Sequence, residues 1–424
     1  MSRSLPKVPA LIFAVLAIGG FAWFFFAEDR EHAYRVYLHN WLMFAALSQG
    51  ALVLSCAMRL TNARWQGPVH VIVDSLGAFV PLALLLFLGI YVGRHEVFEF
   101  THHPIAGKEW WFEEGFLFKR DVVALGWMTL LSIGYLYMSM RPRLAHARQH
   151  ATKFRGLYAA WTSGWRGDAA EERLAERRLR KFAAILALSY GFCYSLIAVD
   201  MIMSLAPHWL STMFPAYFAW GGFLSAVSLT ALLCVLMRNS SELSGAITES
   251  RRHDLGKMVF AFSIFWMYLF WSQYLVIWYG NIPEETGFLM SRLGSQFLQD
   301  TWYLDKFWMR ISEPYVKVTL LVWFLCWGSP FWILLGQKPK KAPVILGAVT
   351  FGSVLGFWLE RYILVTPSLV SPAAVLEGAS ITPVGFTEIA IGLGFLGLFF
   401  LSFLSFGWLF PGAMPAPGEE ATSS

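Results

Sequence analysis

The sequence predicts an all-α membrane protein with ten transmembrane helices. Of its 424 residues, 57% are hydrophobic and only 14% are charged, whereas an ordinary soluble domain has roughly 45–50% apolar and 25% charged residues. The chain also contains ten apolar segments of about 20 residues or more, which is the length that a helix needs to cross a hydrocarbon core of about 30 Å. These two observations exclude an ordinary water-soluble globule.

The ten expected spans follow one another along the chain as long apolar runs with few charges. In order, they are 8–27, 34–58, 69–93, 121–140, 181–206, 213–237, 255–279, 315–336, 343–366 and 388–410. We expect them to form a single integral membrane domain over residues 1–410. The remaining segment, 411–424, has the composition of a disordered tail.

The first span resembles a signal peptide at its start, because Arg3 and Lys7 precede an apolar run. That run is long, however, and the sequence FFFAED at its end offers no small-residue cleavage site. We therefore expect a retained helix.

Spans three and seven share a weak internal similarity. Each starts with a segment that carries His and Asp and ends in an I-x-x-G pattern, which closes at Gly93 and Gly280. Because these spans are four apart, they run in the same direction. The similarity predicts two parallel four-helix bundles, about 34–206 and 213–366, with the first and last spans flanking them.

The distribution of Lys and Arg predicts that both termini are cytoplasmic. With that orientation, about two thirds of these residues lie on the cytoplasmic side, as the positive-inside rule requires. The net charge of +5 follows from the same bias, so it gives no support to a nucleic-acid partner.

Three connecting segments have distinctive compositions. Segment 168–181, DAAEERLAERRLRK, opens with Asp168 and Glu171 at capping-box spacing and is expected to form a basic helix at the level of the lipid headgroups, leading into the fifth span. The long outer loops, 94–120 and 280–314, are rich in aromatic residues and mixed charge, which favours a docking surface over a linker.

The cysteine and histidine patterns argue against a metal or haem centre in this chain. The cysteines stand alone in apolar stretches, without a CxxC or CxxCH motif, and are expected to be small buried hydrophobes. A transmembrane b-type haem needs two facing ligands, yet only His39 and His70 approach span interiors, from opposite ends. We expect any redox chemistry to be carried out by a partner or by a diffusible cofactor.

Ionisable residues inside spans are the candidate functional residues, because each costs about 2.5–3.5 kcal/mol on insertion scales. Asp74 lies near the cytoplasmic end of span three, one turn from His70, so the two can face each other. Asp200 lies in the outer third of span five, with His208 two turns further on. The sequence places no cation next to Asp200.

Two further groups complete the candidates. His253 and Asp254 lie at the cytoplasmic start of span seven, and Glu360 and Arg361 lie in the outer part of span nine. Because neighbours at i, i+1 do not face each other on a helix, we expect Glu360 and Arg361 to pair with other helices. We expect one outer cavity and one cytoplasmic access route, lined respectively by Asp200, His208, Glu360 and Arg361 and by His70, Asp74, His253 and Asp254.

Several long motifs cover most of the chain from residue 40 onward. They are DMIMSLAPHWLSTMFPAYF (200–218), HDLGKMVFAFSIFWMYLFWSQYLVIWYGNIPEET (253–286), FWLERYILVTPSL (357–369) and TEIAIGLGFLGLFF (387–400), together with LTNARW (60–65) and FKRDV (118–122). In these motifs the chain resembles the NrfD or polysulfide reductase family of quinol-interacting membrane subunits. Within that family it is similar to the second copy found in bacterial alternative complex III.

The resemblance implies a subunit of a quinol:cytochrome c oxidoreductase, or one with another periplasmic acceptor, in the bacterial cytoplasmic membrane. The implied partners are a homologous quinol-oxidising subunit, a periplasmic iron–sulfur subunit, c-type cytochrome subunits and a terminal oxidase. Haem and iron–sulfur clusters belong to those partners, and this chain holds no covalently bound cofactor. Menaquinone or ubiquinone is the implied quinone, and the second copy is associated with assembly and proton translocation.

The resemblance also suggests roles for particular residues. Its buried carboxylates and histidines map onto the proton-path candidates Asp74, His70, Asp200, His253, Asp254, Glu360 and Arg361, while Asp200 and His208 are candidates for a quinone cavity. The chain departs from the family at Cys56, where a histidine would be expected before the LTNARW turn. That departure weakens a protonatable relay at this point.

Two other functions remain open. A structural scaffold with a degenerate quinone site has no need to bury Asp200, so Asp200→Asn would leave its assembly and turnover intact. A secondary transporter also combines paired bundles with carboxylates near the membrane midplane, but the expected spans lack matched Gly/Pro breaks.

Overall fold

The fold is described from a computed structural model that covers residues 6–63, 67, 69–103, 105, 107–150, 154–165, 167, 169–240, 246–294, 314–369 and 384–410. These residues form helices and turns and contain no strand. Ten helical segments are long and apolar enough to cross a membrane, which confirms the predicted all-α class and the number of spans.

Seven spans are continuous helices, whereas the third and eighth are interrupted and the fifth ends in a short 3₁₀ turn. The bounds are α1 Lys7–Phe26, α2 Arg30–Leu60, α3 Val69–Leu76 and α4 Val80–Val92, α6 Glu114–His150, α8 Ala169–Met201, α9 Phe214–Met237, α10 Glu249–Gly280, α13 Pro314–Trp323 and α14 Ser329–Ile333, α16 Pro343–Leu369 and α18 Phe386–Leu409. The short connecting helices are α5 Arg94–Val97, α7 Arg155–Trp161, α11 Pro283–Leu293 and α15 Gln337–Lys341.

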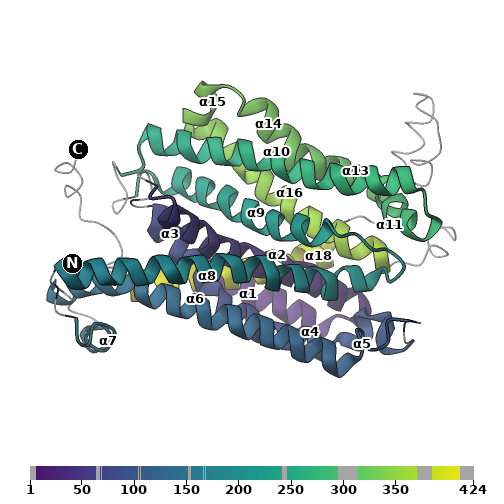
Figure 1. The fold of residues 1–424 in the computed structure, drawn as a ribbon, viewed down its shortest axis with the longest axis horizontal. Coiled ribbons are helices and arrows are strands. Elements are labelled where there is room, and N and C mark those ends of the chain that lie inside the picture. The colour runs from purple at the N-terminus through teal and green to yellow at the C-terminus, as the bar shows by residue number, and fades with distance from the viewer. Residues whose placement is uncertain are drawn as a thin grey trace.

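The long helices lie side by side along the long axis of the molecule, with α2 near the centre (Figure 1). Helix α2 packs against α3, α4, α8, α9, α16 and α18. Small residues permit this close packing: a Cβ added at Gly50 would lie 2.6 Å from the carbonyl oxygen of Gly222 on α9. Backbones that approach so closely gain dispersion contacts that lipid does not offer.

The spans of the first predicted bundle, α2, α3, α4, α6 and α8, are treated as one group of helices, and those of the second, α9, α10, α13, α14 and α16, as another. The packing does not separate the two groups, because α2, α3 and α8 also pack against α9, and α2 packs against α16. The division into two bundles and their relation by an internal repeat therefore stay predictions.

Helices α1 and α18 form an antiparallel pair at the edge of the molecule. Gly20 contacts Gly394, and Phe13 stacks on Phe400 with ring centroids 5.0 Å apart. A Cβ added at Gly20 would overlap the backbone of Gly394, so glycine is required at this crossing. The other side of α1 exposes large apolar side chains, as a lipid-facing helix does.

The two interrupted spans differ in cause and position. In the third span, a 3₁₀ turn at Gly77–Phe79 precedes Pro81, and a Cβ at Gly77 would overlap the side chain of Leu52. In the eighth span, a π-helical turn at Phe324–Gly328 precedes Pro330. The interruptions therefore fall in the second span of one group and the third span of the other, which are not matching positions.

Several helices extend beyond the predicted spans. Helix α6 covers Glu114–His150 where 121–140 was expected, and α8 joins the predicted basic helix to the fifth span without a break. Glu171 accepts a hydrogen bond from the backbone N–H of Gly167 at 3.1 Å. The predicted capping residue Asp168, much of the loop 280–314 and the tail 411–424 lie outside the described residues.

Candidate functional site

A first polar cluster surrounds Asp74, in the span formed by α3 and α4. Helix α3 places His70 one turn away, and its Nδ1 lies 3.3 Å from Asp74 Oδ1. Both side chains are buried, and the hydroxyl of Ser55 on α2 donates a hydrogen bond to Asp74 Oδ1 at 2.7 Å. The predicted pairing of His70 with Asp74 is therefore present in the structure.

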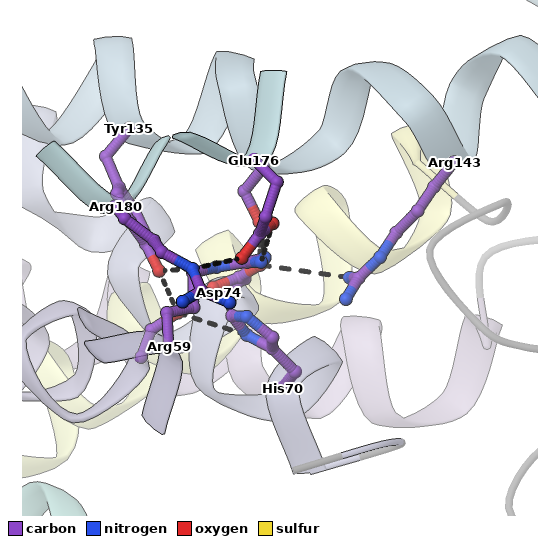
Figure 2. A network of polar contacts seen from close by, with 9 residues as sticks. Arg59, His70, Asp74, Tyr135, Arg143, Glu176 and Arg180 are labelled. Atoms are coloured by element: carbon purple, nitrogen blue, oxygen red, sulfur yellow. Dashed lines mark hydrogen bonds and ion pairs between the residues drawn. The ribbon is translucent and has the colours of Figure 1, made fainter. Parts of the chain in front are cut away.

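The other carboxylate oxygen of Asp74 faces α6. It accepts a hydrogen bond from the Ser139 hydroxyl at 3.0 Å and lies 3.9 Å from Nη1 of Arg143. Arg59 of α2 donates hydrogen bonds to Ser139 at 2.7 Å and to the Tyr135 hydroxyl at 3.0 Å. Figure 2 shows Arg59 from α2, His70 from α3, and Tyr135 and Arg143 from α6 around Asp74.

The Asp74 cluster reaches the surface through α8. Arg59 Nη1 lies 3.7 Å from Glu176 Oε2, and Glu176 pairs with Arg180 at 3.1 Å (Figure 2). The side chain of Glu176 is 43% exposed, whereas that of Asp74 is 1% exposed. A line of polar groups therefore connects a fully buried carboxylate with the edge of the helix group.

One further polar pair lies on α2 and α6, on the side of the Asp74 cluster that faces the middle of these helices. Gln49 and Ser132 are buried and exchange hydrogen bonds at 3.0 and 3.2 Å between α2 and α6. Beyond Ser132, the side chains that α6 buries are mainly apolar, such as Leu125 and Met128. Ser132 and Asp121 are eleven positions apart on α6, a rise of about 16.5 Å.

A second polar cluster surrounds Asp200 near the other end of α6. Arg120 donates two hydrogen bonds to the Asp200 carboxylate, at 2.7 Å from Nε and 2.6 Å from Nη2. The indole N–H of Trp111 donates a third at 3.2 Å, and the Arg120 guanidinium stacks over the Trp111 ring at 3.9 Å. The sequence places no cation next to Asp200, and the structure supplies one from α6, a helix that is distant in sequence.

Asp121 lies next to this ion pair and is completely buried. Its carboxyl group interacts with that of Asp200 through a side-chain hydrogen bond and through like charge, and no other described residue hydrogen-bonds its oxygens. Two carboxyl groups and one guanidinium therefore share this site. His208, in contrast, is exposed on the loop after α8.

Glu360 and Arg361 form a third buried polar group, on α16. Arg361 Nη1 donates to Glu360 Oε2 at 2.6 Å, so these neighbours pair with each other as well as contacting α9, where only contacts with other helices were predicted. The two side chains leave the helix in different directions, but both are long enough for their charged ends to meet. Arg361 also donates to the carbonyl of Phe218 at 3.1 Å and lies over its ring at 4.2 Å.

His253 and Asp254 lie on a more exposed part of α10. Asp254 pairs with Lys257 at 2.6 Å on the helix surface. Among the described residues, no hydrogen bond or ion pair joins His253 or Asp254 to the Asp74 cluster. Of the four residues expected along one access route, the structure brings together only His70 and Asp74.

A cavity of about 290 Å³ lies between α9, α10, α11, α13 and α16. Aromatic side chains dominate its lining, and Glu360 contributes a carboxylate. Asp200 and His208, the candidates for a quinone cavity, are not among its lining residues. The four residues predicted to line one outer cavity are therefore spread over several sites.

Arg292 of α11 closes one end of this cavity. Its guanidinium donates to the carbonyls of Phe288, Ile363 and Leu364, at 2.7, 3.0 and 2.9 Å, and to the hydroxyls of Ser291 and Ser368, at 2.9 and 2.7 Å. Burial lowers the pKa of Arg292 to about 9, so it remains a cation at neutral pH. All five N–H groups of Arg292 donate: three of them fasten α11 to the C-terminal part of α16, and two bond back to α11 itself.

Sequence reasoning missed Arg59, Arg120, Asp121 and Arg143 as site residues. FKRDV contains two of them, but the sequence analysis uses it only as one of the motifs that carry the resemblance and assigns no role to Arg120 or Asp121. The useful signal was a charged pair directly preceding a long apolar run. Comparison with protein-family models and with curated proteins finds no match for this chain.

Proposed function

We propose that this chain is the second NrfD-like membrane subunit of a quinol oxidoreductase of the alternative complex III type, where it supports assembly and proton translocation. In this proposal, it lies in the bacterial cytoplasmic membrane with both termini cytoplasmic. Quinol is oxidised in a homologous subunit, and electrons pass through iron–sulfur and c-type cytochrome partners to an oxidase.

The Asp74 cluster is the observation that carries this proposal. A carboxylate inside a membrane-length helix group is costly, and apolar residues would serve packing alone at lower cost. Here hydroxyls, an imidazole and two guanidinium groups contact it or one another, and one member of the cluster, Glu176, is partly exposed. Such groups provide successive hydrogen-bonding positions along which a proton can move.

Buried and half-buried charged side chains also coincide with the motifs that resemble the family. Arg120 and Asp121 lie in FKRDV, Asp200 begins DMIMSL, and Glu360 and Arg361 lie in FWLERY. Those motif positions are therefore occupied by polar interactions within the spans. The resemblance therefore includes charged residues within the spans and is not limited to surface loops.

A structural scaffold is the alternative that one observation favours. The bidentate Arg120–Asp200 pair joins α6 to α8 and would hold these helices together without any proton transfer. The apolar stretch between Ser132 and Asp121 fits this function too, since no hydrogen-bonded chain joins the two clusters among the described residues. The transporter alternative gains no support, because the interrupted spans do not correspond.

The deciding experiment measures proton translocation by the purified complex in liposomes during quinol oxidation. We expect Asp74→Asn to reduce the number of protons taken up from one side per electron, while electron transfer continues. The control is Asp254→Asn, which removes a carboxylate that is paired on the helix surface and should leave the ratio unchanged. An unchanged ratio in Asp74→Asn would favour the scaffold.

A further inference from the structure

Helix α15 lies across the beginning of α10, at the end of the molecule where the seventh span starts and the eighth and ninth spans are joined (Figure 1). The two backbones lie close together, because a Cβ added at Gly256 would be 2.9 Å from the Cβ of Lys340. Arg252 Nε also donates a hydrogen bond to the carbonyl of Lys341 at 3.2 Å. The crossing therefore brings the lysines of α15, in the sequence QKPKK, next to the charged residues of α10.

This crossing carries a surplus of positive charge. Helix α15 and residues 249–259 of α10 contain six Lys and Arg but two Asp and Glu, which gives a net charge of +4 with histidine counted as neutral. Both acids are already paired, Glu249 with Lys341 at 3.0 Å and Asp254 with Lys257 at 2.6 Å. The lysine side chains of these pairs are 42% and 54% exposed. Exposed ion pairs are weak, so either lysine can turn to another anion.

Three of the ammonium groups surround one point. Those of Lys257, Lys340 and Lys341 all act electrostatically on His253, so they lie around its side chain although they come from two elements. Lys340 is the most enclosed of them and is 7% exposed. Its Nζ lies 3.4 Å from the carbonyl oxygen of Leu335, and among the described residues no carboxylate pairs with it. An ammonium group has three N–H donors, so Lys340 has donors left for a further acceptor.

Exposed apolar side chains adjoin the lysines. The Lys340 ammonium lies 5.0 Å from the centre of the Phe260 ring, which stacks on Phe331 with ring centroids 5.8 Å apart. Trp332 follows Phe331 and is 68% exposed, and Val344, in the first turn of α16, is 78% exposed. A ligand that covers both surfaces has an anionic head and apolar chains. A soluble anion or an acidic protein segment would neutralise the lysines but leave the apolar side chains uncovered.

We propose that Lys257, Lys340 and Lys341 bind the phosphate of an anionic phospholipid, whose acyl chains lie against the exposed side chains of α14 and α16. Lipid headgroups lie at the ends of the spans, where this crossing also lies, so the lipid reaches the lysines without leaving its leaflet. The bound phosphate would balance the surplus charge and hold α15 against α10. The site rests on the ten spans and on the geometry of the crossing, and it does not depend on the proposed function.

Native mass spectrometry of the purified, delipidated protein tests this site. The probes are dioleoyl phosphatidylglycerol, which is anionic, and dioleoyl phosphatidylcholine, which has the same chains and no net charge. We expect the first phosphatidylglycerol to bind about 5-fold or more tightly than the first phosphatidylcholine. Lys257→Gln combined with Lys341→Gln should weaken phosphatidylglycerol binding about 5-fold for each charge removed, because each lysine near an anionic headgroup contributes about that factor.

The matched control is Arg173→Gln combined with Arg177→Gln. It removes two positive charges from the exposed surface of α8, on the side of the membrane where α10 also begins, and should bind phosphatidylglycerol like the wild type. Lys340→Gln leaves both ion pairs of the crossing in place and removes the enclosed ammonium. We expect it to weaken phosphatidylglycerol binding by about 5-fold as well.

Three results would overturn the lipid site. They are equal affinity for the two lipids, equal losses in the two double variants, and displacement of phosphatidylglycerol by an equal concentration of inorganic phosphate or polyglutamate. The last result would assign the lysines to a soluble anion instead.

Discussion

Arg120 and Asp200 show at the scale of single residues how this chain accommodates charge within its spans. The planar guanidinium matches both carboxylate oxygens, while Trp111 covers the pair and donates a further hydrogen bond. Removing one partner of such a buried pair leaves an unpaired charge, which costs about 3–5 kcal/mol. Removing both charges avoids that cost.

We therefore expect Arg120→Ala to lower the stability of the purified protein by about 3–5 kcal/mol, and the added change Asp200→Asn to recover part of the loss. Denaturation in detergent measures both effects. Arg94→Ala is the control, because its partner Glu114 is partly exposed and such pairs contribute about 0–1 kcal/mol. Equal losses in Arg120→Ala and Arg94→Ala would mean that the buried pair has no special role.

The sequence identified the buried carboxylates of the candidate site, but it did not identify the residues from other helices that pair with them. Asp74 with His70 was foreseen because both lie on one helix, where a spacing of four residues fixes proximity. Arg120 was not linked to Asp200, since 80 residues separate them and only the packing of α6 against α8 brings them together. Pairing between helices depends on rotation about each helix axis, which hydropathy does not encode.

At the scale of elements, the α1–α18 pair also shows that contacts between helices depend on individual residues and not on hydropathy. Both helices are apolar on all sides, so composition identifies them as spans without indicating which faces meet. The contact is decided by glycine: a Cβ at Gly20 would overlap Gly394 and Ala390, whereas a Cβ at Gly19 would meet nothing within 4 Å.

Gly20→Ala is accordingly expected to force α1 away from α18 and to cost about 1–3 kcal/mol, as overpacking does. Gly19→Ala adds the same methyl group on the open side and should leave stability unchanged or slightly raised. Thermal unfolding of the two variants in identical lipid provides the comparison. A similar midpoint for both would show that the glycine contact is not tight in the membrane.

Helix limits were the least predictable property of the elements. The apolar run of the fourth span begins at Asp121, but the helix begins at Glu114 and continues to His150. Hydropathy detects only the part of a helix that lies in lipid, whereas hydrogen bonding continues into the aqueous phase wherever side chains permit. As a result, Arg120 was assigned to a loop although it belongs to a helix.

At the scale of the whole molecule, the distribution of positive charge can be tested directly. Glu96 on α5 and Arg177 on α8 are exposed and lie toward opposite ends of α6. With cytoplasmic termini, a membrane-impermeant maleimide should label Glu96→Cys in intact spheroplasts. Arg177→Cys should be labelled only after the membrane is permeabilised.

The opposite pattern would reverse the orientation and exchange the sides assigned to the two polar clusters. Three of the four native cysteines are buried and the fourth is partly buried, so the unaltered chain serves as the background for this labelling. Equal labelling of both positions in intact cells would argue against a single orientation.

The ion pair on α16 has a consequence for the synthesis of the chain. Glu360 and Arg361 are neighbours in sequence, so each provides the other's counter-ion while the ninth span is still alone in the insertion machinery. Arg120 and Asp200 emerge from the ribosome 80 residues apart, so Arg120 must wait for the fifth span before its charge is balanced. The fourth and fifth spans therefore have reason to enter the bilayer as a hairpin, whereas the ninth can enter singly.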